Sequence, residues 1–155
     1  MSYKSNVIAI NPALSFGLNF DSSDLRANKQ GRSSSRQVHL LRDKRRQPPP
    51  PSSFLSHIQG SLFYLVYGVT PQKHRWNLVG ADITATIAHQ QRGQVILPKP
   101  IPPKYKCLPH RMYHILVGRQ QVQLDRRALN SFRDRESYTI YYAPKSKYAL
   151  SAELD

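Results

Sequence analysis

The stretch ESYTIYYAPKSKYALSAE, residues 136–153, decides the predicted fold class. Residues 137–143 and 148–152 each alternate apolar with other side chains, and this period of two is typical of β-strands. Between the two runs, residues 144–147 supply a proline and polar side chains, which favours a turn. The stretch therefore predicts an antiparallel hairpin. One face of this hairpin is predicted to carry Tyr138, Ile140 and Tyr142 from the first strand and Tyr148, Leu150 and Ala152 from the second.

An isolated hairpin is only marginally stable in water, so this one predicts further strands upstream. Segment 98–109 holds five prolines and is predicted to be a long surface connection between strands. With five to seven short strands in all, the sequence predicts a mainly β domain, either a small antiparallel barrel or a sandwich. The upstream strand candidates are 61–69, 76–88, 94–97 and 112–124; we predict a loop at 70–75, a turn at 91–93, a kink at 118–119 and a short helix after Asp125.

The N-terminal third of the chain has a different composition. Residues 21–47 are polar and basic, and they offer too little apolar surface to offset the entropy lost on ordering. The prolines at 48–51 predict a short polyproline II spacer. We therefore predict a flexible, basic, Ser/Pro-rich arm and linker over residues 1–52, with residues 21–47 disordered. A β-rich domain is predicted over residues 53–155, opened by a helical turn at 53–59.

The chain carries a large positive charge, with a formal net charge of +14 and a pI near 10.3. Residues 1–60 hold nine Lys or Arg against three Asp, and residues 61–155 hold fourteen against six acidic residues. The charge is therefore shared by both halves and does not belong to the predicted arm alone. Such a surplus attracts polyanions, which include nucleic acids and acidic membrane surfaces.

The compartment is predicted from the cysteine content and from the lack of targeting segments. Cys107 is the only cysteine, so no intramolecular disulfide can form, which fits a reducing compartment. The apolar residues near the N-terminus are interrupted by Pro12 and by asparagines, unlike a secretory signal. No apolar run approaches the roughly 18–20 residues of a membrane span. We therefore expect a cytoplasmic protein with no membrane span.

One cluster has a spacing like that of metal ligands: Cys107, His110 and His114 form C-x2-H-x3-H. Zinc sites of known pattern need a further paired ligand, and Pro109 interrupts the spacing, so we predict no metal here. No nucleophile elbow, glycine-rich phosphate loop or paired catalytic carboxylates occur in the sequence. The sequence therefore predicts a non-catalytic protein without a cofactor, and it indicates no small-molecule substrate.

Basic residues interleaved with aromatic residues are the strongest functional signal in the sequence. Proteins that bind single-stranded nucleic acid combine a cationic groove with aromatic faces on which bases stack, often on small β-barrels. The clusters therefore predict a nucleic-acid-binding module. The candidate binding residues are Lys73, Arg75, Trp76, Lys104, Tyr105, Lys106, Arg111, Lys145, Lys147 and Tyr148.

A second interpretation is a protein–protein interaction module, or adaptor, whose sheet edge or proline-rich loop docks an acidic protein partner. The placement of the charges separates the two interpretations. Lys and Arg gathered on a face with exposed aromatic rings favour nucleic-acid binding, whereas scattered cations favour the adaptor.

Overall fold

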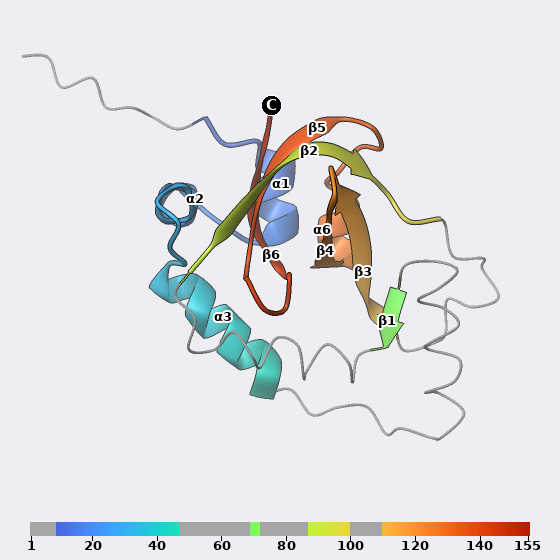
Figure 1. Ribbon diagram of the computed structural model, residues 1–155. Helices are drawn as coiled ribbons and strands as arrows, with labels where there is room; N and C mark the ends of the chain where they lie inside the picture. The colour runs from blue at the N-terminus through green and yellow to red at the C-terminus, as the bar shows by residue number, and fades with distance from the viewer. Residues whose placement is uncertain (1–8, 47–68, 72–86, 100–109) are drawn as a thin grey trace, which may run out of the picture.

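The computed structural model of the protein describes residues 9–46, 69–71, 87–99 and 110–155. Its strands form an antiparallel sheet that is not closed, with the order β1-β3-β2-β5-β6 and with β4 paired to β3 (Figure 1). The prediction of a mainly β chain is therefore confirmed for the described part. A barrel or a sandwich, the finer part of that prediction, is not established by these pairings.

The hairpin predicted at the C-terminal end of the chain is confirmed. Strand β5 (Ser137–Tyr142) pairs with β6 (Ala149–Leu154), with Ile140 opposite Ala152. Ile140 is fully buried, as the alternating pattern predicts. The opposite face is buried too, because helices α1 and α2 pack on β6 and leave Tyr141 only 2% exposed.

Strand β2 (His89–Ile96) differs from the prediction. Residues 91–93 do not form a turn; they continue the strand, which pairs first with β5 and then, at Val95 and Ile96, with β3. A Cβ atom on Gly93 would lie 2.8 Å from the backbone nitrogen of Gly118. The glycine therefore lets a neighbouring backbone approach closely inside a strand, a role that its sequence context does not distinguish from a turn.

Strands β3 (His110–Val117) and β4 (Gln120–Asp125) form a second hairpin. The predicted kink at Gly118 and Arg119 is its turn, and Gly118 has φ of +58°, which glycine adopts without strain. Strand β1 (Val69–Pro71) pairs with β3, so the predicted loop does not begin at residue 70.

Strand β4 also contacts the segment that leads into β6. The Gln123 amide donates to the Lys147 carbonyl at 2.8 Å, and a parallel bridge joins Gln123 to Tyr148. The Tyr148 hydroxyl donates to an Asp125 carboxylate oxygen, also at 2.8 Å. One end of β4 is therefore fixed to the closing hairpin across the gap in the sheet.

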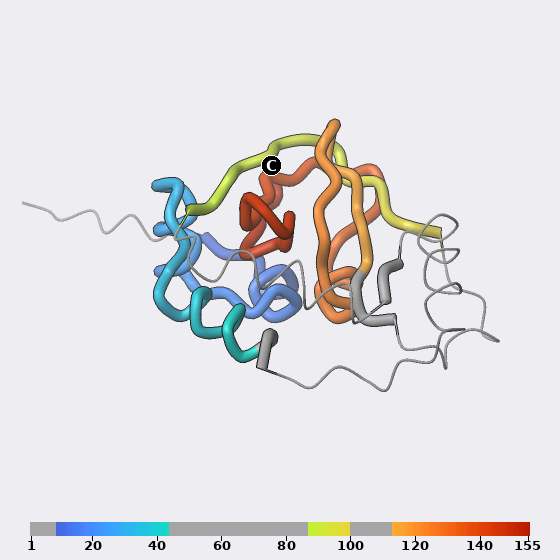
Figure 2. The backbone as a smooth tube through the Cα atoms, turned by 60° about the horizontal axis from the view of Figure 1, so that its bottom comes forward, coloured from blue at the N-terminus to red at the C-terminus, as the bar shows by residue number. Residues whose placement is uncertain are grey.

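The predicted disorder of residues 21–47 is wrong for the described residues 21–46. Helices α1 (Pro12–Leu18), α2 (Ser22–Lys29) and α3 (Ser35–Arg46) fold there, and Leu14, Phe20 and Leu25 lie in the same core as Ile140. In both ribbon and tube views, the closing hairpin lies between α2 and α3 on one side and the β3–β4 hairpin on the other (Figures 1 and 2). The N-terminal segment is thus part of the folded unit.

Helix α6 (Arg126–Leu129) confirms the short helix predicted after Asp125, although the Asp125 side chain makes no capping hydrogen bond. It packs against α1 at Gly17, where an added Cβ would lie 2.9 Å from the Ser131 Cβ. Glycine is therefore needed at this crossing for the two helices to come this close.

Several predictions fall outside the described residues. They are the helical turn at 53–59, the domain boundary at 52/53, the strands over 61–68 and 76–86, and residues 100–109 of the predicted proline-rich connection. None of the described helices is long and apolar enough to cross a membrane.

Candidate nucleic-acid interface

Three of the predicted binding residues have described side chains: Lys145, Lys147 and Tyr148, which belong to the turn of the closing hairpin. The backbone of Arg111 lies in β3, but its side chain is outside the described part. The structure therefore tests the predicted site only at this turn. Lys73, Arg75, Trp76, Lys104, Tyr105 and Lys106 lie outside the described residues.

The turn has a fixed backbone. The Ala143 amide donates to the Tyr148 carbonyl at 2.9 Å, and the Lys147 amide donates to the Ala143 carbonyl at 3.0 Å. The buried Ser146 hydroxyl accepts from the Tyr148 amide at 3.2 Å. Lys147 adopts φ of +59°, a left-handed conformation that costs a non-glycine residue energy. These bonds hold the two lysines on a rigid support.

Tyr148 does not provide the exposed stacking ring that the sequence predicts. It is only 9% exposed, and it packs with Leu41, Ala143 and Leu150. Its hydroxyl is held by Asp125 at 2.8 Å. The apolar alternation of the closing hairpin continues through this residue, so the ring is turned inward against α3 rather than outward to solvent.

The lysine that follows the turn lies near a second tyrosine. The Lys147 ammonium is 5.3 Å from the centre of the Tyr142 ring, and the His89 ring meets the same ring edge-on at 5.8 Å. Burial raises the pKa of Tyr142 above its ordinary value, so its hydroxyl stays neutral at physiological pH. Lys145, one residue beyond Pro144, is exposed.

The connection between β2 and β3 returns to the sheet at the same end as this turn. It re-enters at His110, and two residues later Met112 is opposite Asp125. Asp125 in turn binds Tyr148 of the turn. In sequence, Lys104, Tyr105 and Lys106 lie in this connection, a few residues before His110.

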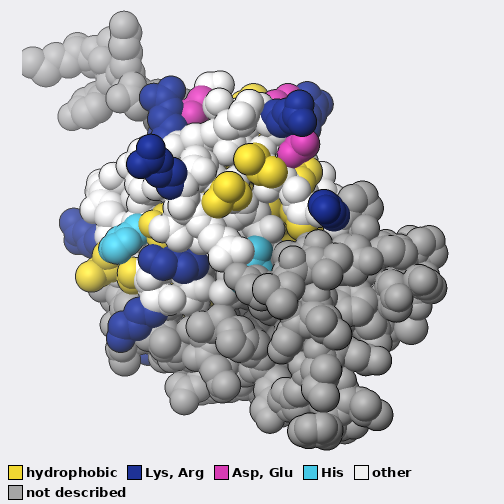
Figure 3. Space-filling view, turned by 45° about the vertical axis from the view of Figure 1, so that its right-hand side comes forward, with side chains coloured by type: hydrophobic (Ala, Val, Ile, Leu, Met, Phe, Trp, Pro, Cys, Tyr) yellow, Lys and Arg dark blue, Asp and Glu magenta, His cyan; other side chains and the backbone are white. Residues whose placement is uncertain are grey.

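The described cations do not gather into one patch. Lys and Arg side chains lie at separate places around the face seen in Figure 3, with hydrophobic side chains between them. Five are paired with carboxylates, and the shortest pairs are Lys29 with Glu153 at 2.7 Å and Arg92 with Asp155 at 2.8 Å. This scatter matches the pattern that the sequence analysis assigns to an adaptor. Within the described residues, no ion pair is made by Arg26, Arg32, Arg42, Lys99, Arg119, Arg126 or Lys147.

Two features of the structure have no counterpart among the residues that the sequence predicts. The first is an exposed apolar pair on β2 and β3, where Ile96 is 50% exposed, Leu116 is 38% exposed and the two are opposite each other. Leu116 belongs to a run of apolar residues, and such a run does not reveal which side chain faces solvent.

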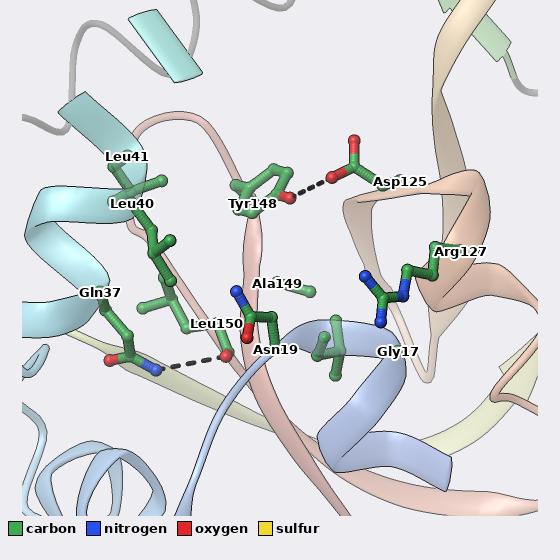
Figure 4. A pocket seen from close by; sticks show the side chains of 11 residues that line it. Gly17, Asn19, Gln37, Leu40, Leu41, Asp125, Arg127, Tyr148, Ala149 and Leu150 are labelled. Carbon is green, nitrogen blue, oxygen red and sulfur yellow. Dashed lines mark hydrogen bonds between the residues drawn. The ribbon is translucent and has the colours of Figure 1, made fainter. Parts of the chain in front are cut away.

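The second feature is a pocket of about 160 Å³ between α1, α3, α6 and β6 (Figure 4). It brings Gly17 and Leu18 of α1 close to Leu41 of α3 and Arg127 of α6. No sequence signal links these residues, because the pocket depends on α1, which lies in the predicted flexible arm, and on α3, which lies in the segment predicted to be disordered.

Metal ligation is not decided by the described residues. No three His, Cys, Asp or Glu side chains come close enough to hold an ion within the described ranges. Cys107 and the side chain of His110 lie outside those ranges, so the absence of a zinc site stays a prediction.

Comparison with known proteins found no matching family model, no similar curated protein and no similar solved structure. The chemistry of the residues and the connectivity of the strands therefore carry the argument for function.

Proposed function

We propose that the protein binds single-stranded nucleic acid at the end of the sheet that holds the 143–148 turn and His110, the residue at which the β2–β3 connection re-enters the sheet. The observation that carries the proposal is the strand connectivity. Strands β2, β3 and β4 follow one another as neighbours in the sheet, and α6 comes next. Strand β5 then returns to pair with β2, and Tyr148, directly before β6, forms a parallel bridge with β4.

This connectivity supports a partly open five-stranded Greek-key barrel of the OB type as the finer architecture. Such barrels bind oligonucleotides on the face of their second and third strands and with the loops between strands one and two and between strands four and five. The corresponding parts here are the β3–β4 face, the connection over residues 97–109 and the turn over residues 143–148. Lys104, Lys106, Lys145 and Lys147 all belong to these two loops.

The net charge and the lysines of the two loops support the same ligand, although the described cations as a whole are scattered over the surface (Figure 3). A fold does not by itself determine a function, so the ligand has to be argued from the charges of the site. The net charge of +14 attracts a polyanion over a long range, and lysines on a fixed turn are suited to phosphate contacts. With Tyr148 buried, the stacking part of the proposal rests on Tyr105 and Trp76.

The test measures the affinity for a fluorescent single-stranded oligonucleotide at several salt concentrations. Replacing Lys145 and Lys147 together by glutamine should weaken binding and reduce the slope of log affinity against log salt by about 1.4, because each phosphate contact contributes about 0.7. The matched control replaces Arg26 and Arg119 by glutamine. This double variant loses the same charge, but from α2 and from the opposite end of the β3–β4 hairpin. Equal losses in both double variants would show that the attraction is nonspecific and would reject the proposed interface.

The adaptor is the second candidate function, and the exposed pair Ile96 and Leu116 favours it. An exposed apolar pair in register on two neighbouring strands is suited to docking a protein, and the positive charge of the chain is suited to an acidic partner. Replacing both residues by serine should leave oligonucleotide binding unchanged. If the unaltered protein has no oligonucleotide affinity at physiological salt and the double variant loses a protein that co-purifies with it, the adaptor replaces the first proposal.

A further inference from the structure

The pocket between α1, α3, α6 and β6 has one apolar side and one cationic side. Leu40 and Leu41 from α3 and Leu150 from β6 form the apolar side, and the guanidinium of Arg127 reaches from α6 toward α1 on the other side (Figure 4). Its volume of about 160 Å³ is close to that of an engineered cavity of about 150 Å³ that binds benzene. The space is therefore sufficient for a ring-sized apolar group.

Arg127 is the polar group of this pocket that keeps its hydrogen-bonding capacity. Its guanidinium lies 3.8 Å from the centre of the Phe16 ring, which fixes its position by a cation–π contact. Within the described residues no carboxylate pairs with it and no hydrogen bond involves its side chain. Arginine presents a planar fork of donors that matches a carboxylate.

The other polar side chains that line the pocket are already bound within the protein. Asp125 accepts from the Tyr148 hydroxyl at 2.8 Å, as Figure 4 shows. Gln37 donates to the Leu150 carbonyl at 3.2 Å and to Asn28 at 3.0 Å. Asn19 accepts from Arg36 at 2.9 Å. Arg127, which is exposed, is therefore the cation of the pocket that has no hydrogen-bond partner among the described residues, and it lies in a pocket that also holds aliphatic side chains and the Asp125 carboxylate.

We propose that this pocket binds a small organic acid, with an apolar body about the size of a benzene ring and a carboxylate held by Arg127. The apolar body would replace water against the leucines, and the carboxylate would take up the donors that the Phe16 contact holds in place. The pocket adjoins the proposed nucleic-acid interface, because Tyr148 of the 143–148 turn lines it. The binding of an organic acid does not, however, rest on the binding of nucleic acid.

The experiment uses benzoate as the probe and benzamide as its neutral isostere. Both are titrated into the full-length protein while backbone amide chemical shifts are followed by NMR. We expect saturable binding of benzoate at about 1 mM, a value reasonable for a ligand of this size. Benzamide should bind about tenfold more weakly, because it lacks the charge that pairs with the guanidinium. The shifts should cluster on residues of α1, α3, α6 and β6 that line the pocket.

The matched variants are Arg127→Gln and Arg126→Gln, which remove neighbouring charges of the same helix. Arg126 does not line the pocket, so its replacement should change the benzoate affinity by less than about twofold, whereas Arg127→Gln should abolish the preference for benzoate over benzamide. Equal effects of the two variants, or equal binding of the two probes to the unaltered protein, would overturn the proposal. The probe comparison on the unaltered protein decides the question even if Arg127→Gln does not fold. Benzoate-induced shifts confined to the 143–148 turn would also overturn the proposal of an organic-acid pocket. So would a protein that binds a mononucleotide but does not bind benzoate.

Discussion

The closing hairpin and the N-terminal helices are held to the same core by different means. In the hairpin, apolar and aromatic side chains alternate along β5 and β6, and Ile140 is fully buried. Helices α2 and α3 contribute few apolar residues, and their buried groups include Asp24, Asn28 and Gln37. One region is fixed mainly by apolar burial and the other largely by a polar network.

The polar network connects α2 and α3 to β6. The amides of Asn28 and Gln37 bond reciprocally at 2.8 and 3.0 Å, and Gln37 also donates to the Leu150 carbonyl. The Ser151 hydroxyl donates to Asn28 at 2.5 Å. A second buried group, Asp24, binds Arg36 at 2.8 Å. Composition alone assigns such a segment to disorder, because polar residues that satisfy one another in a fold look the same in sequence as polar residues that remain hydrated.

The largest effect is expected for Ile140→Ala in the hairpin. Its side chain is fully buried opposite Ala152, so its truncation should lower the free energy of unfolding by about 2–5 kcal/mol. Denaturant unfolding measures this loss. A change below about 1 kcal/mol would mean that the hairpin is not anchored by apolar burial, and the contrast between the two regions would fail.

The next effect is expected for Asn28→Ala in α2. The substitution removes the acceptor of the buried Ser151 hydroxyl and one of the two partners of each polar atom of the Gln37 amide, so it should cost about 1–3 kcal/mol. In Asn28→Ala, amide hydrogen exchange should become faster in α2 and α3 than in β5, because the network joins the helices to β6, whereas β5 is held by its own strand pairings.

Asn130→Ala is the matched control for this prediction. Asn130 is exposed at the end of α6, and its replacement should change the stability by less than about 0.5 kcal/mol. If Asn28→Ala is as mild as this control, the helices are not held by the polar network, and apolar contacts such as that of Leu25 hold them instead.

The sequence predicts those elements for which the local pattern of residues is sufficient to specify the structure. The closing hairpin has a turn proline between two alternating runs, and the short helix follows Asp125 directly, so both were found. Gly93 was assigned to a turn because a glycine needed for close backbone approach has no local signature. The same limit applies to Tyr148, whose exposure depends on where α3 packs.

The candidate sites were predicted less well than the fold. The basic turn at Lys145 and Lys147 could be found from composition, because charge next to aromatic residues is a local feature. The pocket at Arg127 could not be found, since it needs Phe16 and Leu41 brought from segments far away in the chain. The N-terminal helices also belong to the core, so deleting residues 1–47 would remove Leu14 and Leu25 from it. A loss of nucleic-acid binding in that deletion variant could therefore come from a disturbed fold rather than from lost charge.

A smaller effect is expected for Asp21→Ala at the start of α2. Its carboxylate accepts from the Ser23 hydroxyl at 2.6 Å and from the Asp24 amide at 2.9 Å, and it completes a capping box with Asp24. Loss of such a cap costs about 0.5–2 kcal/mol. Thermal or denaturant unfolding at neutral pH measures this cost.

The contribution of Asp21 should depend on pH. The Ser23 hydroxyl first, and then the Asp24 amide, lower the pKa of Asp21 below its ordinary value of 3.8. Because the folded-state pKa is depressed, the stabilisation is present above the unfolded value and is lost as the pH falls through the folded one. The difference between the unaltered protein and Asp21→Ala should therefore shrink below about pH 4. Asp21→Asn keeps a cap acceptor without the charge, so its loss at neutral pH should be smaller than that of Asp21→Ala. This loss should also shrink below about pH 4, because Asp21 of the unaltered protein is the group that titrates. A loss equal to that of Asp21→Ala would assign the effect to charge alone.

The smallest effect on stability is expected for Lys145→Ala, which lies within the closing hairpin itself. Lys145 is exposed in the turn, and surface substitutions of this kind change the stability by no more than about 0.5 kcal/mol. The backbone bonds of the turn run between Ala143, Lys147 and Tyr148, so they do not depend on this side chain. Ile140→Ala and Lys145→Ala therefore compare a buried and an exposed position of one hairpin under the same denaturant.

Equal losses of stability at the two positions would show that the assignment of buried and exposed positions is wrong. A small loss of stability together with a weaker salt dependence of oligonucleotide binding is the expected result, because it separates the support that the hairpin gives to the fold from the charge that its turn presents.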